Sequence, residues 1–138
     1  MGLTFTDASW GDYQFLHHLL EERIKEPNIN ISHKEMPGWK QHIQFCASNP
    51  YKLWYVIRYD DIQVGTVYLT KNNEIGVHLL KAYRDKHLGQ QAVEFLEGKV
   101  PSGTKILANI NPHNEKSLHF FERNGYTILQ VTYQKETL

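Results

Sequence analysis

The chain has 138 residues, and its 15 lysines and arginines balance its 15 aspartates and glutamates, which gives a formal net charge of zero. This balance argues against a general nucleic-acid-binding protein, which would show a basic excess or a basic stripe. No stretch approaches the ~20 apolar residues of a membrane span, and the N-terminus lacks the basic and then apolar pattern of a secretory signal. The length suits a single domain over residues 1–138. The single cysteine, Cys46, suits a reducing compartment, so we expect a cytoplasmic protein with no membrane partner.

The first part of the chain predicts one strand and two helices. Residues 3–8 alternate like a short strand, and residues 13–25 place apolar side chains at helical spacing, with Pro27 as the expected end. Residues 36–47 predict a second helix, with Pro37 near its first turn.

Three strand-like runs follow at residues 51–59, 62–70 and 74–80. They are rich in aromatic and β-branched residues or alternate between apolar and polar positions. The connections at 60–61 and 71–73 are short and polar, so the simplest interpretation is an antiparallel meander.

The rest of the chain predicts alternating helices and strands, at residues 89–100, 104–110, 114–124 and 126–135. Asn114 is the expected N-cap of the third of these elements, and Gly125 its C-terminal stop. The predicted fold class is α/β (α+β), with a mixed, mostly antiparallel sheet of about six to seven strands and helices on both faces.

The turn "RDKHLG" at residues 84–89 connects a predicted strand to a predicted helix. The first N–H groups of a helix have no partner within it, and the helix dipole adds positive charge there, so such a turn can hold an anion. Arg84 and Lys86 would strengthen the local field, and Gly89 would let a ligand approach the backbone closely. From the residues alone, a plain polar connection remains the alternative.

Two segments resemble motifs of the GNAT superfamily of N-acetyltransferases. "EIGVHLLKAYRDKHLGQQAVEFL" resembles its acetyl-CoA-binding motif, which is a strand, then Arg/Gln-x-x-Gly-x-Gly/Ala, then a helix. Arg84 matches the first position and Gly89 the last, while His87 replaces the middle glycine. "INPHNEKSLHFFERNGY" resembles the second motif, in which Asn114 opens a helix that Gly125 follows. The resemblance implies a GNAT-like domain with a splayed central strand pair.

The resemblance also implies acetyl-CoA as cosubstrate and no metal. The coenzyme diphosphate would lie on the amides of residues 85–90, and the pantetheine would pair with the strand around His78, where a β-bulge would open a slot toward residues 104–110. The eight histidines are scattered and show no metal-binding spacing. The positions that the resemblance assigns to the coenzyme are Leu79, Leu80, Arg84, Asp85, Lys86, His87, Leu88, Gly89, Gln90, Asn114, Ser117, Phe120 and Phe121.

For catalysis, an amine that titrates like lysine must lose a proton before it attacks a thioester. Glu74 and His78 are the candidate bases, since they lie two alternations apart on one face of a strand, with Gly76 leaving room between them. Their plainer interpretations are a solvated strand end and a half-buried packing residue. Phe121 stands where the family often has a tyrosine and cannot donate a proton. Either Ser117 or water would then protonate the thiolate, or its protonation is not assisted at all.

We therefore expect an N-acetyltransferase that moves the acetyl group of acetyl-CoA to a primary amine by direct attack. "SHKEMPGW" resembles a segment of amino-sugar acetyltransferases, which favours a small-molecule acceptor such as an amino sugar. The alternatives are acetylation of a protein N-terminus and a non-catalytic acyl-CoA-binding regulatory module. The last predicted strand also offers an edge through which a homodimer could form.

Overall fold

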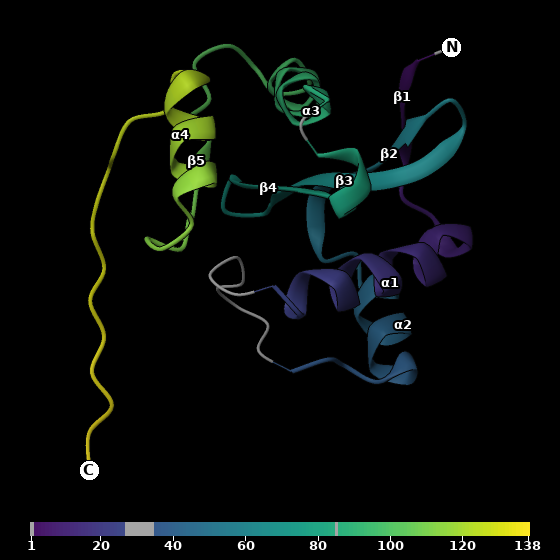
Figure 1. Ribbon diagram of the computed structural model, residues 1–138, viewed down its shortest axis with the longest axis horizontal. Helices are drawn as coiled ribbons and strands as arrows, with labels where there is room; N and C mark the ends of the chain where they lie inside the picture. The colour runs from purple at the N-terminus through teal and green to yellow at the C-terminus, as the bar shows by residue number, and fades with distance from the viewer. Residues whose placement is uncertain (1, 27–34, 85) are drawn as a thin grey trace.

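The computed structural model describes residues 2–26, 35–84 and 86–138 (Figure 1). Its strands are β1 (Leu3–Asp7), β2 (Tyr51–Tyr59), β3 (Ile62–Thr70), β4 (Glu74–Leu79) and β5 (Leu107–Ala108). Its helices are α1 (Tyr13–Ile24), α2 (Trp39–Ala47), α3 (Leu88–Glu97) and α4 (Glu115–Arg123), with short 3-10 turns at Trp10–Asp12 and Lys81–Tyr83. Pro27, the expected end of the first helix, lies outside the described residues, and α1 ends before it at Ile24.

The strands lie in the order β1-β2-β3-β4-β5 in one sheet. The pairs from β1 to β4 are antiparallel, so the predicted meander is confirmed, and β5 pairs with β4 in parallel. Asp60 and Asp61 both have positive φ, 50° and 66°, as a tight two-residue hairpin turn requires.

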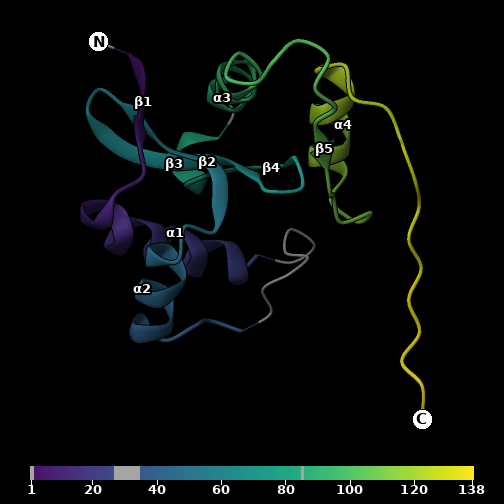
Figure 2. The same cartoon turned by 180° about the vertical axis from the view of Figure 1, so that it is seen from behind.

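Helices cover both faces of the sheet, as predicted. Helices α1 and α2 lie on one face, α3 lies on the other, and α4 stands beside β5 (Figures 1 and 2). The strand alternation divides the side chains of the sheet between two environments. Val67, Leu69 and Ile75 join Val93 and Leu96 of α3 in the hydrophobic core, while their neighbours along the strands face α1 and α2.

The described residues form five strands, fewer than the predicted six to seven, because one predicted strand is absent; another is much shorter than predicted. The predicted strand at 104–110 pairs only at Leu107 and Ala108, and the predicted strand at 126–135 pairs with no strand of the described residues. This last segment leaves the body of the molecule (Figures 1 and 2), and Leu129, Val131 and Tyr133 are 70–92% exposed. An alternating pattern alone does not form a strand, because the segment also needs a neighbouring strand with which its backbone can form hydrogen bonds.

Helix α4 begins and ends where its sequence signals predict. The Asn114 side chain accepts a hydrogen bond from the Ser117 N–H at 3.2 Å, and Gly125, with φ of 90°, follows the last turn. Helix α2 begins at Trp39, three residues after the predicted start, because Gly38 has extended backbone angles. None of the helices within the described ranges is both long enough and apolar enough to cross a membrane.

Candidate functional site

Strands β4 and β5 diverge almost as soon as they meet. They pair at Glu74 with Leu107 and at Ile75 with Ala108, and the rest of β4 pairs with β3 alone. The predicted splayed strand pair is therefore present. The β3–β4 ladder runs from Leu69–Ile75 to Gly65–Leu79 without a register shift, so the splay comes from the early end of β5 and not from the expected bulge in this ladder. The diverging half of β4 offers main-chain groups to an extended ligand.

The turn before α3 presents several N–H groups that have no acceptor among the described residues. His87 is the N-cap of α3 with φ 60° and ψ 16°, in the left-handed region that a glycine would otherwise occupy. Within the described part of the chain, no acceptor is bonded to the N–H groups at positions 86–90, which are Lys86, His87, Leu88, Gly89 and Gln90. Together with the helix dipole, these groups form a site for an anion such as a diphosphate. Asp85 lies outside the described residues.

Three elements converge at Gly89. A Cβ there would lie 3.4 Å from ring carbons of Phe120 on α4 and 3.8 Å from Leu79 Cδ1 at the end of β4. The start of α3, the end of β4 and one face of α4 therefore meet at the anion site. Leu80 follows the last residue of β4, and its N–H donates a hydrogen bond to the Val64 carbonyl at 2.8 Å.

The other predicted positions on α4 have different surroundings. Ser117 is half-buried in the first turns of the helix, and its N–H donates to Asn114. Phe121 is 8% exposed and packs in the hydrophobic core against Tyr126, with ring centroids 5.1 Å apart. Its side chain therefore serves packing in this structure.

Arg84 holds two elements together at the anion site. Its Nη1 donates to Glu26 Oε2 at 2.7 Å, its Nη2 bonds to the other oxygen of that carboxylate, and its Nε donates to the Leu79 carbonyl at 3.2 Å. The hydrogen bond from Arg84 lowers the pKa of Glu26. Arg84 thus joins the region just after α1 to the end of β4.

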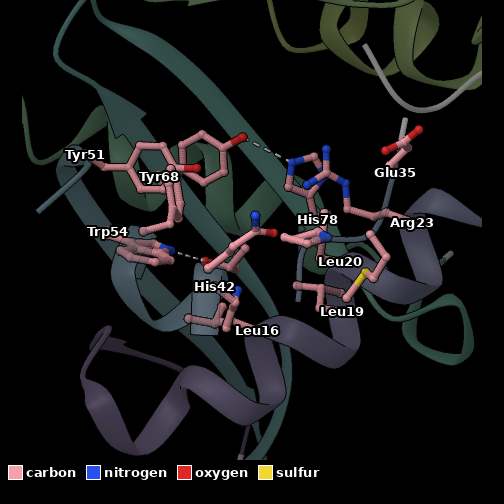
Figure 3. Close-up of a pocket in the computed structure, with 15 residues that line it drawn as sticks. Leu16, Leu19, Leu20, Arg23, Glu35, His42, Tyr51, Trp54, Tyr68 and His78 are labelled. Carbon is pink, nitrogen blue, oxygen red and sulfur yellow. Dashed lines mark hydrogen bonds between the residues drawn. The ribbon is translucent and has the colours of Figure 1, made fainter. Parts of the chain in front are cut away.

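A cavity of about 410 Å³ lies on the other side of the sheet, between β2–β4 and helices α1 and α2 (Figure 3). Most of its lining is apolar or aromatic. The residues that line it include Leu16, Leu19, Leu20 and Arg23 of α1, His42 and Phe45 of α2, and Tyr51, Trp54, Thr66, Tyr68 and His78 of the sheet.

Of the two candidate bases, the structure brings His78 to this cavity. Tyr68 Oη lies 3.4 Å from His78 Nε2, and both side chains line the cavity. Glu74 does not line it, and its carboxylate accepts hydrogen bonds from Thr70 Oγ1 at 3.2 Å and Asn109 Nδ2 at 2.7 Å. Gly76 is required between them, since a Cβ there would lie 2.1 Å from the Tyr68 ring. The room that the glycine leaves is filled by Tyr68.

Two cavity residues were not predicted from the sequence, Tyr68 and Arg23. Tyr68 lies opposite Gly76 in the β3–β4 register, and burial raises its pKa, so it remains a protonated phenol that can donate a hydrogen bond. Arg23 follows Leu16 by seven residues, which places it on the apolar stripe of α1. Two sequence signals could have found them. Tyr68 lies opposite a glycine in the neighbouring strand, and Arg23 is a cation on the apolar face of a helix.

The burial of His42 predicts that the free energy of unfolding depends on pH. His42 is 5% exposed, its Nε2 lies 2.7 Å from the Tyr13 carbonyl, and burial lowers its pKa below 6.5. The unfolded chain therefore takes up this proton first, and the free energy of unfolding falls as the pH drops below 6.5, by about 1.4 kcal/mol for each unit of pKa depression. Melting temperatures between pH 5 and 8 check this: His42→Gln should flatten the curve, whereas the same change at exposed His18 should not.

No group of three histidine, cysteine, aspartate or glutamate side chains among the described residues is placed to hold a metal ion. The thiol of Cys46 is buried beside His42, with Sγ 3.5 Å from Nε2, and burial raises its pKa to about 11. It is therefore a thiol and not a nucleophilic thiolate at neutral pH.

Comparison with solved structures places this arrangement among known folds. The protein YncA of Salmonella typhimurium, solved with its cofactor acetyl-CoA, shares 14% identity with a TM-score of 0.77, covering 92% of this chain and 80% of its own. An N-acetyltransferase of Staphylococcus aureus Mu50 shares 13% identity with a TM-score of 0.75, over 90% and 82% of the two chains. RimL, a ribosomal L7/L12 alpha-N-protein acetyltransferase solved with coenzyme A, shares 15% identity with a TM-score of 0.79. The match covers 99% of this chain and 86% of RimL.

A comparison with curated proteins found no match. The sequence model of the acetyltransferase (GNAT) family, in contrast, matches residues 13–126, which span α1 to the residue after Gly125. This range includes the diverging strands, the turn before α3 and all the residues that line the cavity. The chain therefore belongs to the GNAT family of acetyltransferases and uses acetyl-CoA as its cosubstrate.

Proposed function

We propose that this acetyltransferase moves the acetyl group of acetyl-CoA to the primary amine of a small molecule such as an amino sugar. The observation that carries the proposal is a combination of two features: N–H groups at positions 86–90 that have no acceptor among the described residues, and the open half of β4 beside them. A diphosphate needs the first, and an extended polyamide arm needs the second. Both are present in one place, next to a cavity on the far side of the same strand.

The residues of the turn and of β4 fit the coenzyme. The N–H groups at positions 86–90 would hold the diphosphate, Leu79 and Phe120 would border it, and the main chain around His78 would pair with the arm. Leu80 contributes through its side chain, since its N–H is already bonded. When bound, acetyl-CoA supplies a thioester carbon that an amine can attack. Asn114 and Ser117 would shape the α4 side of the slot.

We further propose His78 as the base that takes the proton of the attacking amine, because its side chain reaches the cavity. Glu74 is the second candidate, acting from the N-terminal end of the same strand face, and its bonds to Thr70 and Asn109 hold it in place. For the departing thiolate, Ser117 is a candidate donor, and the Tyr68 phenol is another that the structure adds. Phe121 cannot protonate the thiolate, because its side chain has no proton to donate; its contact with the coenzyme remains a prediction.

The cavity favours a small acceptor over a protein N-terminus. Its volume of about 410 Å³ lies within the range of small-molecule sites, and helices α1 and α2 close one side of it. The "SHKEMPGW" segment begins outside the described residues, but its Met36 and Pro37 line the cavity. The lone buried cysteine suits a reducing compartment, so a cytoplasmic location remains our prediction.

Two measurements test the proposed function. Calorimetry with acetyl-CoA should show binding, and no binding at submillimolar coenzyme to a folded sample would end the proposal. Release of free thiol with a panel of glucosamine, spermidine and an N-terminal peptide should then identify the acceptor class, with mass spectrometry of the products. A peptide acetylated faster than both small amines would replace the small-molecule acceptor with a protein N-terminus.

We also propose a homodimer in which the C-terminal segment of one copy pairs with the exposed edge of β5 in another. The segment 127–135 alternates, and its apolar residues Leu129, Val131 and Tyr133 are exposed, while β5 is an edge strand of the sheet. Sedimentation should show a dimer for the full chain and a monomer after removal of residues 127–138. Val131→Asp should weaken the dimer more than Thr132→Asp on the opposite face. A monomeric full chain at micromolar concentration would exclude the pairing.

A further inference from the structure

Arg23 is a cation on an apolar surface. Leu16, Leu19 and Leu20 precede it by seven, four and three residues, and all four side chains line the cavity under the sheet. In the view of Figure 3, Tyr51 and Trp54 stand toward one end of the cavity, and Arg23 and His78 toward the other. No lysine and no other arginine lines the cavity within the described residues.

Among the described residues, Arg23 has no carboxylate partner, in contrast to Arg58 and Arg84. Arg58 pairs with Asp12 at 2.9 Å and Arg84 pairs with Glu26. Arg23 has no ion pair within 4.0 Å among the described residues, and its buried Nε has no hydrogen-bond partner. Burial lowers the pKa of Arg23, which reflects the cost of an unpaired charge in this environment.

The nearby acidic groups do not compensate for this charge. Glu26 is occupied by Arg84, and Glu22 accepts a hydrogen bond from the Lys81 N–H. Glu35 lines the cavity at the same end as Arg23 (Figure 3), but no ion pair joins them. The phenols of Tyr51 and Tyr68 are neutral, since burial raises the pKa of both.

We propose that Arg23 binds an anionic group of the acceptor, so that the substrate is an amine that also carries a carboxylate or a phosphate. The anionic group and the amine would both lie at the end of the cavity with Arg23 and His78, and the apolar walls from Leu16, Leu20 and Trp54 would contact the rest of the molecule. A planar guanidinium suits both anions, because it can form two parallel hydrogen bonds to their oxygens. This inference rests on the proposed function, since it names the acceptor of the same site.

Matched pairs of amines test the inference and separate the two anions. Glucosamine 6-phosphate is compared with glucosamine, and methionine with methioninamide, by the kcat/KM of thiol release. We expect the anionic member of at least one pair to be preferred by about 10- to 100-fold, as one or two charge-assisted hydrogen bonds would give. The preferred pair tells phosphate from carboxylate. Equal kcat/KM values within both pairs would overturn the inference.

Variants on the same helix tie the preference to Arg23. Arg23→Met keeps the apolar stem and should abolish the preference, and Arg23→Lys should retain part of it. Exposed Lys25 provides the matched control, since Lys25→Met should leave the preference intact. A preference that survives in Arg23→Met would contradict the assignment.

A binding measurement keeps this inference separate from the proposed function. Acetyl-CoA affinity by calorimetry should be the same in Arg23→Met and wild type, because Arg23 lies on the face of the sheet opposite the core that packs on α3. If the protein transfers no acetyl group to any amine, the proposed function fails. Calorimetric titration with the four amines then decides the inference alone: tighter binding of the anionic members that Arg23→Met removes supports it, and equal binding refutes it.

Discussion

Replacing His78 with glutamine is expected to lower the kcat of acetyl transfer by about 10²- to 10⁴-fold at neutral pH, the range that a positioned general base contributes. His78 lines the cavity beside Tyr68, whose Oη lies 3.4 Å from its Nε2. Glutamine can keep a hydrogen bond to Tyr68 but cannot take up a proton. The loss should therefore fall on kcat, with the acceptor KM changed by less, in steady-state kinetics at saturating acetyl-CoA.

The matched variant is Glu74→Gln on the same strand face. The Glu74 carboxylate does not line the cavity and already accepts two hydrogen bonds, so we expect a smaller loss of kcat than in His78→Gln. The effect on kcat should still be larger than the effect on the acceptor KM. A wild-type pH–rate profile in Glu74→Gln would remove Glu74 from the mechanism. A wild-type kcat in His78→Gln, with Glu74→Gln inactive, would reverse the two assignments.

The sheet and most helices could be predicted because their signals are local. Strands β2 and β3 have the predicted bounds, since alternation and short polar turns determine an antiparallel meander without reference to the rest of the chain. The start of α4 after Asn114 could likewise be predicted, because the cap is a hydrogen bond between residues only three apart, Asn114 and Ser117. The turn after β4 was predicted from the same kind of local pattern, and its N–H groups at positions 86–90 have no acceptor among the described residues.

The features that could not be predicted depend on contacts between distant residues. The alternation at 126–135 does not reveal whether a neighbouring strand exists, and in this structure none pairs with it. Arg84 has the motif position of a coenzyme residue, but its partner is Glu26, 58 residues earlier. Tyr68 became a candidate only when the register placed it over Gly76, and Arg23 only when α1 was packed against the sheet.

The second large effect is expected at Gly89, where valine should weaken acetyl-CoA binding by about 10- to 100-fold, the loss of one or two charge-assisted hydrogen bonds. A Cβ at this position already lies 3.4 Å from the Phe120 ring and 3.8 Å from Leu79, so the two further methyl groups of valine must displace these side chains or extend over the unpaired N–H groups. Either outcome keeps the diphosphate from the backbone.

Calorimetric titration with acetyl-CoA measures this loss against two controls. Lys86→Met removes a surface charge, worth at most about 1 kcal/mol, and should weaken binding by no more than about 5-fold. Gly11→Val makes the same chemical change where no atom lies within 4 Å of the new Cβ, and should leave binding unchanged. The backbone N–H groups, and not the basic side chains, are then the main contact with the diphosphate. A larger loss in Lys86→Met than in Gly89→Val, with both proteins folded, would assign that contact to the side chain instead.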